Sequence, residues 1–261
     1  MYTKNPFVRK PSENRSEFIF GVRAVLEAVL AGKDIDKILL RKDLETELTK
    51  ELFDALKGSR VPVQRVPVEK LNRVTMKNHQ GVVAFVSEVT YQRLEDILPM
   101  LYEEGKIPFI VLLDGITDVR NFGAIARTCE CAGVHAIVIP MTDSVSVNAD
   151  AVKTSAGALH TLPVCREKTI REAILLLKDS GVKVVAASEK AADSYTIADY
   201  SGPVAIVMGA EDTGIASENL RICDNLVQIP ILGKIGSLNV SVAAGILMYE
   251  AVKHRTENGN L

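Results

Sequence analysis

The segment IPILGKIGSLNVSVAAGILMYEAVK, residues 229–253, joins a short apolar strand to a long apolar helix through a loop that contains two glycines. The strand is predicted over 226–229 and stops at Pro230, and the helix is predicted over 240–253. Ser237 and Asn239 lie at the far edge of the loop. Small polar side chains between a buried strand and a buried helix indicate a ligand site, because a plain connection would be more polar and less constrained.

The predicted helix over 240–253 has almost no polar face in its first three turns. Its apolar residues there are Val240, Val242, Ala243, Ala244, Ile246, Leu247 and Met248. A helix that is apolar on all sides is buried all round or forms part of a subunit interface. We therefore expect core packing, with dimerisation as the alternative.

Two further loops upstream have the same character. The runs FIVLL (109–113) and VAIVM (204–208) are apolar without alternation, which is typical of strands in a parallel sheet covered on both faces. Ligands bind beyond the carboxyl ends of such strands. The loops over 114–123, 209–214 and 232–239 are therefore expected to converge on one pocket.

These loops and the segments next to them supply the candidate site residues Asn121, Arg127, Glu211, Ser237 and Asn239. Each has an ordinary structural interpretation: the asparagines and the serine as helix caps, Glu211 as a solvated acid, and Arg127 as a surface arginine. Arg127 lies off the apolar stripe of its predicted helix over 122–132, so it need not be buried. The occurrence of these residues together at three strand ends favours a site.

The standard nucleotide-binding signatures are missing. No G-x-G-x-x-G run occurs, which disfavours a nicotinamide-dependent enzyme, and GAEDTG (209–214) continues with Ile215 and Ala216 where a P-loop requires Lys and Ser or Thr. Glu211 and Asp212 in this loop would repel phosphates. They suit a cationic ligand, such as the sulfonium cofactor S-adenosylmethionine.

Composition places the chain among ordinary globular proteins. It has 261 residues, 47% of them hydrophobic, and a net charge of −2. Its N-terminus has no apolar core typical of a signal peptide, and no apolar run approaches the length of about 20 residues that crosses a bilayer. The four cysteines fit neither a disulfide framework nor a zinc site, and we expect them to be small buried side chains. We expect a cytoplasmic protein with no membrane and no metal partner.

The pattern predicts two α/β domains: a flexible basic arm over 1–15, a small domain over 16–89, an acidic helical linker over 90–107 and a larger domain over 108–261. The small domain is predicted to contain helices over 22–31, 45–57 and 68–74 and strands over 35–40, 61–66 and 82–86. The larger one is predicted to contain strands over 109–113, 136–139, 183–187, 204–208 and 226–229, and helices over 122–132, 169–180 and 240–253.

Basic residues cluster in the arm and over 60–80. The second cluster includes Arg60, Arg65, Arg73 and Lys77. Such a run is either a solvated face or a local surface that binds phosphates. We predict that RNA is bound by the arm and by the basic stretch over 60–80, with Arg60, Arg65, Arg73 and Lys77 as RNA-binding residues.

Three motifs resemble those of the SpoU, or TrmH-type, RNA ribose 2′-O-methyltransferases of the SPOUT superfamily. They are NFGAIART (121–128), VMGAEDTG (207–214) and IPILGKIGSLNVSVAAG (229–245), in the family's order and spacing. The front block, from FGVRAVLEAV (20–29) to HQGVVA (79–84), resembles the L30e-like substrate-binding domain of the 23S rRNA guanosine 2′-O-methyltransferase branch.

The resemblance implies a trefoil-knotted methyltransferase domain and a homodimer whose active site draws on both subunits. It places S-adenosylmethionine against Gly209, Ile229 and Leu238 and the flanking Met208 and Ala210. It assigns Asn121, Arg127, Glu211, Ser237 and Asn239 to the catalytic surroundings. Asp212 replaces a glycine of the family loop, which would introduce strain if that glycine has a positive φ.

The predicted activity is methylation of a ribose 2′-hydroxyl in RNA, with a guanosine of 23S rRNA as the target. Within this class, tRNA or another rRNA nucleotide is the alternative. An alternative of another class is a non-catalytic RNA-binding protein with a degenerate methyltransferase domain, against which the retained site residues speak.

Overall fold

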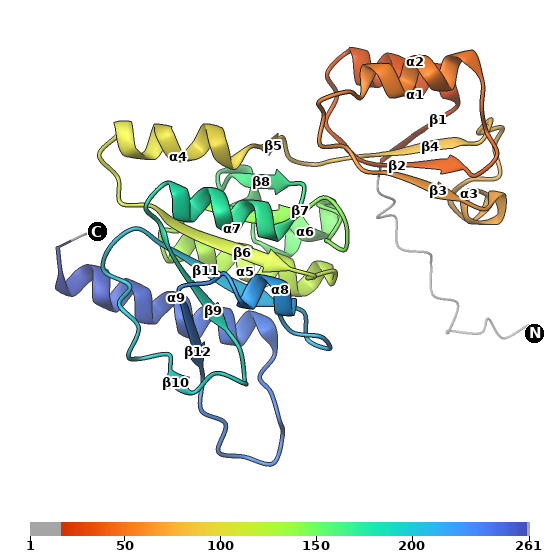
Figure 1. Ribbon diagram of the computed structural model, residues 1–261. Coiled ribbons are helices and arrows are strands. Elements are labelled where there is room, and N and C mark those ends of the chain that lie inside the picture. The colour runs from red at the N-terminus through yellow and green to blue at the C-terminus, as the bar shows by residue number, and fades with distance from the viewer. Residues whose placement is uncertain (1–16, 260–261) are drawn as a thin grey trace, which may run out of the picture.

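The structure, a computed structural model, describes residues 17–259, and the predicted arm over 1–15 lies outside them. A small and a large α/β unit are joined by a strand and a helix (Figure 1). None of the helices within 17–259 is long and apolar enough to span a membrane.

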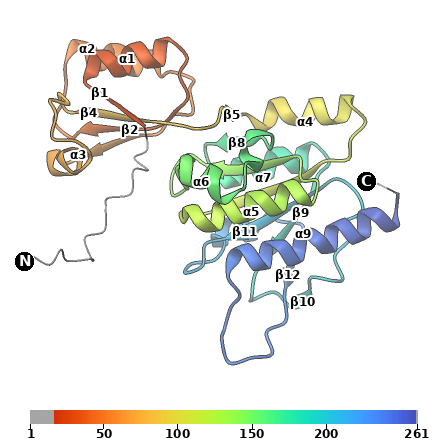
Figure 2. The same cartoon turned by 180° about the vertical axis from the view of Figure 1, so that it is seen from behind.

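The small unit contains β1 (Phe18–Phe20), α1 (Val22–Leu30), β2 (Ile35–Arg41), α2 (Glu47–Ala55), β3 (Val63–Val66), α3 (Val68–Val74) and β4 (Val82–Val86). Its sheet has the order β1-β4-β2-β3, in which only β2 and β3 run parallel. Helices α1 and α2 cover one face, and α3 lies on the other (Figures 1 and 2). Strand β1 has three residues, which is too short for a reliable sequence pattern, and it was not predicted.

The large unit is built on an eight-stranded sheet in which every neighbouring pair is parallel, as predicted. The strand order is β10-β12-β9-β11-β6-β7-β8-β5. The strands are β5 (Tyr91–Gln92), β6 (Phe109–Asp114), β7 (Ala136–Pro140), β8 (Val164–Glu167), β9 (Lys183–Ala187), β10 (Asp193–Ser194), β11 (Val204–Gly209) and β12 (Asn225–Gln228).

Helices cover both faces of this sheet, which explains the absence of alternation in its strands. The helices are α4 (Leu94–Glu103), α5 (Val119–Cys131), α6 (Ala149–Thr154), η1 (Ala158–His160), α7 (Ile170–Asp179), α8 (Ser217–Leu220) and α9 (Val240–Glu257). In β6, Phe109 and Val111 point into a core shared with α5 and α9, whereas Ile110 and Leu112 point into a core shared with α4 and α7. Both faces of the strand are therefore apolar.

The segment over 90–107, predicted as a helical linker, packs with the large unit. It contains β5, which pairs with β8, and α4, whose buried residues join the core over α7. Those residues are Leu94, Ile97, Leu98 and Leu101.

Strand β8 was not predicted because its sequence, VCRE, carries two charged residues. Arg166 and Glu167 are nevertheless buried, because each meets an opposite charge from the small unit. Arg166 Nη2 lies 2.9 Å from Asp36 Oδ1, and Arg60 Nη1 lies 2.5 Å from Glu167 Oε1. Because these partners are more than a hundred residues away in sequence, the local pattern around β8 does not reveal them.

Tyr91 completes this junction between the two units. Its hydroxyl donates to Asp36 Oδ1 at 2.7 Å, and the Arg166 guanidinium carbon lies 3.3 Å from the centre of its ring. Arg166 also donates to the backbone carbonyls of Ile35 and Asp36. The junction is thus a buried, hydrogen-bonded ion-pair network of the kind that holds two parts in a defined orientation.

Two local predictions are wrong, and a third is incomplete. The helix predicted over 122–132 begins at Val119 and is capped by Asp118, whose Oδ1 accepts from the backbone N–H groups of Arg120 and Asn121, so Asn121 is not the N-cap. Core packing alone does not describe helix α9, since Val242 and Tyr249 are 50% and 52% exposed in one chain, which leaves the predicted alternative of a subunit interface. Cys131 is exposed rather than buried.

His135 makes stability depend on pH. Burial lowers its pKa from the ordinary value of 6.5, aided by the nearby charges of Arg255 and Lys106, and its Nδ1 accepts a hydrogen bond from Phe109 N at 3.0 Å. Because the unfolded chain binds this proton more readily, the stabilisation is complete above pH 6.5 and is lost as pH falls toward the lower folded pKa. Urea unfolding should show a larger loss on acidification for the wild type than for His135→Gln; equal losses would contradict this role.

Candidate active site

The carboxyl edge of the large sheet brings three predicted residues into one hydrogen-bonded cluster. Asn121 comes from the first turn of α5, Glu211 from the loop after β11, and Asn239 from the N-cap of α9. Asn239 Nδ2 donates to Glu211 Oε1 at 2.8 Å and to Asn121 Oδ1 at 3.0 Å, and Asn121 Nδ2 donates to Glu211 Oε1 at 3.0 Å. The convergence predicted from the strand ends is confirmed for these three residues.

Glu211 is bound through one oxygen. Its Oε1 also receives the weaker Val240 N–H at 3.5 Å, while Oε2 has no protein donor among the residues within 17–259. Asn239 caps α9, with its Oδ1 accepting from Ser241 N at 2.9 Å. The cluster therefore presents an oriented carboxylate oxygen at the start of a helix.

A second acid fixes the loop that carries Glu211. Asp114, at the end of β6, accepts through Oδ2 from Ala216 N at 2.9 Å and from Asn219 Nδ2 at 2.8 Å. These bonds tie the end of the loop and α8 to the neighbouring strand. The loop is thus held at both ends, by β11 and by Asp114.

Glycine is required where this loop closes on itself. A Cβ on Gly209 would lie 2.2 Å from the carbonyl carbon of Gly214 and 2.3 Å from Ile215 N. The positive φ of the loop falls on Gly214, at 66°, and Asp212 is not among the residues with positive φ. The strain considered for Asp212 is therefore absent.

The five predicted cofactor residues line one pocket beside the cluster: Met208, Gly209, Ala210, Ile229 and Leu238. Ser237 and Glu211 line the same pocket. Ser188 and Glu189 also line it and were missed, although the rule used for the other loops points to them, because they directly follow strand β9. The lining combines apolar side chains, backbone groups and the carboxylates of Glu189 and Glu211. Such a lining fits a ligand with an apolar body and a cationic centre.

Arg127 does not reach this pocket within one chain. It lies on the third turn of α5, is exposed as predicted, and lines a separate cavity with Glu130, Ser155 and Ala156. Its guanidinium has no ion-pair partner among the described residues.

The predicted RNA-binding arginines and lysine fall into three places. Arg60 is 19% exposed in its ion pair with Glu167, so the junction between the units occupies it. Arg65 donates to Lys42 O at 2.9 Å and lies over the ring of Phe53 on the α2 side of the sheet. Arg73 and Lys77 lie on the α3 side, where both are exposed.

Side chains that suit a metal ion do not gather anywhere in the described part of the chain. Within it, no group of three or more His, Cys, Asp or Glu residues has a suitable arrangement.

Both the large and the small unit of this chain match models of known protein families. The model of the SpoU rRNA Methylase family matches residues 108–249, and that of RNA 2'-O ribose methyltransferase substrate binding matches residues 18–92. The Bacillus subtilis protein named "Putative TrmH family tRNA/rRNA methyltransferase YacO" is 32% identical over 93% of this chain and 98% of its own length. A Staphylococcus aureus protein with the same family name is 33% identical over the same shares of both chains.

Solved structures of similar proteins support the same family. An AdoMet-bound rRNA methyltransferase from Sinorhizobium meliloti is 26% identical, with a TM-score of 0.58 over 91% of this chain and 87% of that one. The AdoMet complex of the SpoU methyltransferase AviRb from Streptomyces viridochromogenes is 25% identical, with a TM-score of 0.58 over 92% of this chain and 90% of that one. With a family model that spans most of the large unit and relatives that align almost end to end, the chain belongs to the SpoU rRNA methylase family of RNA methyltransferases.

Proposed function

We propose that this protein transfers a methyl group from S-adenosylmethionine to a ribose 2′-hydroxyl of RNA. The observation that carries the proposal is the cluster of Asn121, Glu211 and Asn239 at the edge of a pocket lined by all five predicted cofactor residues. The family membership supports the reaction, and the AdoMet complexes of two family structures support the cofactor.

The pocket residues would hold the cofactor, which supplies an electrophilic methyl group on a sulfonium when it is bound. Met208, Ile229 and Leu238 offer apolar surface, and Gly209 and Ala210 offer backbone groups. The carboxylates of Glu189 and Glu211 favour a positively charged ligand in the same space.

The remaining task of the protein is to orient the hydroxyl and to assist the loss of its proton. Glu211 Oε2, which no described protein group binds, is placed to accept a hydrogen bond from the ribose. Ser237 and Asn239 would hold the ribose and the chain of the cofactor. Arginine stays protonated, so we assign Arg127 to electrostatic stabilisation and phosphate positioning rather than to the role of base.

A homodimer would bring Arg127 to the site of the partner. In one chain Arg127 lines a different cavity from Glu211, and α9 exposes the apolar side chains of Val242 and Tyr249. These two residues lie about two turns apart and form an apolar stripe along one face of the helix. Burial of this stripe against a second copy would remove an exposed apolar face.

For the target, we favour a guanosine of 23S rRNA, with tRNA as the alternative, and a cytoplasmic location. Two features of the fold belong to the same proposal. The small unit, with its mixed four-stranded sheet between helices, would be an L30e-like RNA-binding domain, and the segment from β12 to α9 would be threaded as a trefoil knot. The position of β12 between β9 and β10 supports such threading.

The decisive experiment is methylation of rRNA and tRNA from a strain that lacks the gene. Labelled S-adenosylmethionine should transfer its methyl group to one of the two RNA classes, and alkali resistance of the modified linkage should map the nucleotide. Calorimetry with S-adenosylmethionine provides the independent readout. Absence of both binding and transfer would favour a non-catalytic RNA-binding protein.

Arg127→Lys should reduce turnover about 100-fold, because an ammonium group does not reproduce the planar fork that positions a phosphate. Steady-state kinetics on the mapped RNA would measure this loss, while the Kd for S-adenosylmethionine stays unchanged. Near-normal turnover would contradict the role of the planar group.

If the site is shared, coexpression of Arg127→Ala with Glu211→Ala should restore activity to about one quarter of wild type, since half of randomly mixed dimers carry one intact site.

A further inference from the structure

The face of the small sheet that carries α3 displays a row of half-buried phenylalanines. Phe18 and Phe85 are paired across β1 and β4 with ring centres 6.5 Å apart, and Phe20 lies 6.2 Å from Phe18. The opposite face is filled by α1 and α2, whereas α3 covers only part of this one (Figures 1 and 2). Aromatic rings therefore remain accessible on the surface of the sheet.

Four cations surround these rings. Lys37 Nζ lies 5.2 Å from the centre of the Phe85 ring, and Lys77 Nζ lies 5.8 Å from that of Phe20. Lys70 and Arg73 extend from α3 over the same face. None of the four forms an ion pair with another residue of the described chain, so their charge is available to an anion.

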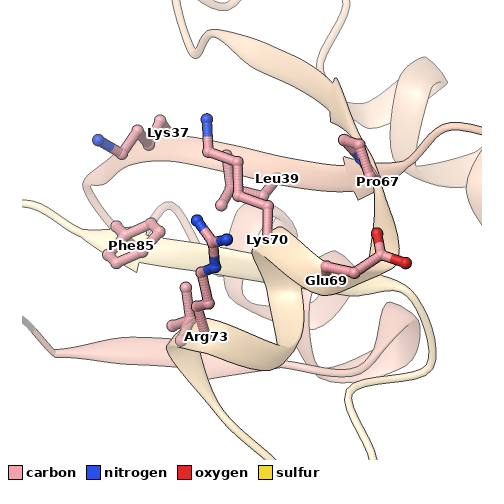
Figure 3. Close-up of a pocket in the computed structure, with 8 residues that line it drawn as sticks. Lys37, Leu39, Pro67, Glu69, Lys70, Arg73 and Phe85 are labelled. Atoms are coloured by element: carbon pink, nitrogen blue, oxygen red, sulfur yellow. The ribbon is translucent and has the colours of Figure 1, made fainter.

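Phe85 and three of the cations, Lys37, Lys70 and Arg73, line an open cavity of about 560 Å³. Leu39 and Phe85 form its apolar part, and Lys70 and Arg73 rise from α3 beside them (Figure 3). Glu69 is the one acid in the lining. An apolar, aromatic wall with three cations at its rim matches a ligand that has a flat apolar part and negative charge.

The cavity adjoins the catalytic edge of the large unit. Lys37 Nζ donates to Ser146 Oγ at 2.8 Å, and Ser146 lies in the loop that follows the carboxyl end of β7. Since all strands of the large sheet run parallel, the loops of the active-site cluster leave from the same edge. A polymer that leaves the cavity beside Lys37 therefore meets the edge where Asn121, Glu211 and Asn239 lie.

We propose that this cavity, which we name the α3 pocket, binds an unpaired nucleotide of the RNA substrate, with its base on Phe85 and adjacent phosphates on Lys70 and Arg73. The proposal rests on the proposed function, because it names the part of the RNA that the small unit recognises. Stacking on aromatic rings requires an unstacked base, so single-stranded loops fit this surface and continuous duplex does not. The α3 pocket also supplies Lys37, from β2, which lies outside the basic stretch predicted to bind RNA.

Three variants of the full chain test the α3 pocket. Lys70→Glu/Arg73→Glu reverses its exposed cations, and Phe85→Leu keeps apolar volume but removes the π face. Arg23→Glu/Lys50→Glu makes the same change of charge on exposed positions of α1 and α2, on the opposite side of the sheet, and is the matched control. Circular dichroism and the Kd for S-adenosylmethionine report whether each variant is folded.

Binding is measured with a fluorescent RNA hairpin that has an unpaired loop and with a blunt duplex of equal length. The charge reversal should weaken hairpin binding at least about 10-fold and reduce the salt slope by about 1.4, which is the loss of two phosphate contacts on a single strand. Phe85→Leu should weaken it about 5- to 100-fold with an unchanged slope, as loss of one stacked base predicts. The control should bind as the wild type does, and the wild type should prefer the hairpin to the duplex.

Equal weakening by the charge reversal and the control would overturn the proposal, because it would show only a general effect of charge. Unchanged binding by both pocket variants, or no hairpin binding by the wild type, would overturn it as well. The methyl-transfer assay separates this failure from that of the proposed function. If the wild type methylates RNA and the pocket variants methylate it equally well, the proposed function stands and the proposed role of the α3 pocket is wrong.

Discussion

Gly209→Ala is expected to weaken S-adenosylmethionine binding about 100-fold, since overpacking costs about 1–3 kcal/mol or more and each 1.4 kcal/mol is a factor of ten. The added Cβ would lie 2.2 Å from the carbonyl carbon of Gly214 and 2.3 Å from Ile215 N. Both atoms belong to the backbone, so the loop after β11 must move as a whole. That loop carries Glu211 and forms one wall of the pocket. Calorimetry with the cofactor measures the effect directly.

Two other glycines provide graded controls for this variant. Gly202 has no atom within 4 Å of an added Cβ and no positive φ, so Gly202→Ala should bind the cofactor normally. Gly214 has open space but a φ of 66°, and Gly214→Ala should produce an intermediate loss that reflects left-handed strain of about 1–2 kcal/mol. Normal cofactor binding by Gly209→Ala would show that the close approach of the two ends of the loop does not shape the pocket.

Arg166→Ala should lower the free energy of unfolding by about 3–5 kcal/mol, because removal of one partner leaves the other charge of a buried pair uncompensated. Asp36 is 4% exposed, and Arg166 supplies its ion-pair partner at 2.9 Å while also covering the ring of Tyr91. Urea unfolding measures the loss. Since this network joins the two units, RNA methylation should fall further than cofactor binding.

Two comparisons isolate the buried pair. Lys57→Ala removes an exposed ion pair with Asp54 and should cost no more than about 1 kcal/mol. Asp36→Leu/Arg166→Met replaces both charges with apolar side chains and should recover much of the stability lost in Arg166→Ala. A loss by Arg166→Ala as small as that of Lys57→Ala would mean that the junction does not depend on this pair.

The sequence predicted those parts of the protein that depend on local pattern. Uninterrupted apolar runs such as 109–113 and 204–208 indicated the parallel sheet, because each of these strands is covered on both faces. The same sheet geometry predicted that Asn121, Glu211 and Asn239 would meet at its carboxyl edge. The same geometry places Ser188 and Glu189, which directly follow β9, at this edge, although they were not predicted.

Other features depend on partners that are distant in sequence. Strand β8 looked too polar to be a buried strand because Asp36 and Arg60, which neutralise its charges, lie in the other unit. The basic run over 60–80 looked uniform, but the fold places Arg60 at the junction, Arg65 on the α2 side, and Arg73 and Lys77 on the α3 side. Charge alone carries no information about the face on which a side chain emerges.

The sequence by itself therefore indicated a ligand site at the loop over 229–239, because small polar residues and glycines at strand ends act through local backbone geometry. The reaction class followed from the resemblance of three sequence motifs to those of a known family. Only the tertiary structure decided that α9 keeps an apolar stripe exposed, that Arg127 lies apart from Glu211, and that aromatic and basic side chains from β2, α3 and β4 form one pocket. Each of these depends on which surfaces the packed elements cover. That coverage is a property of the whole chain and of no single segment.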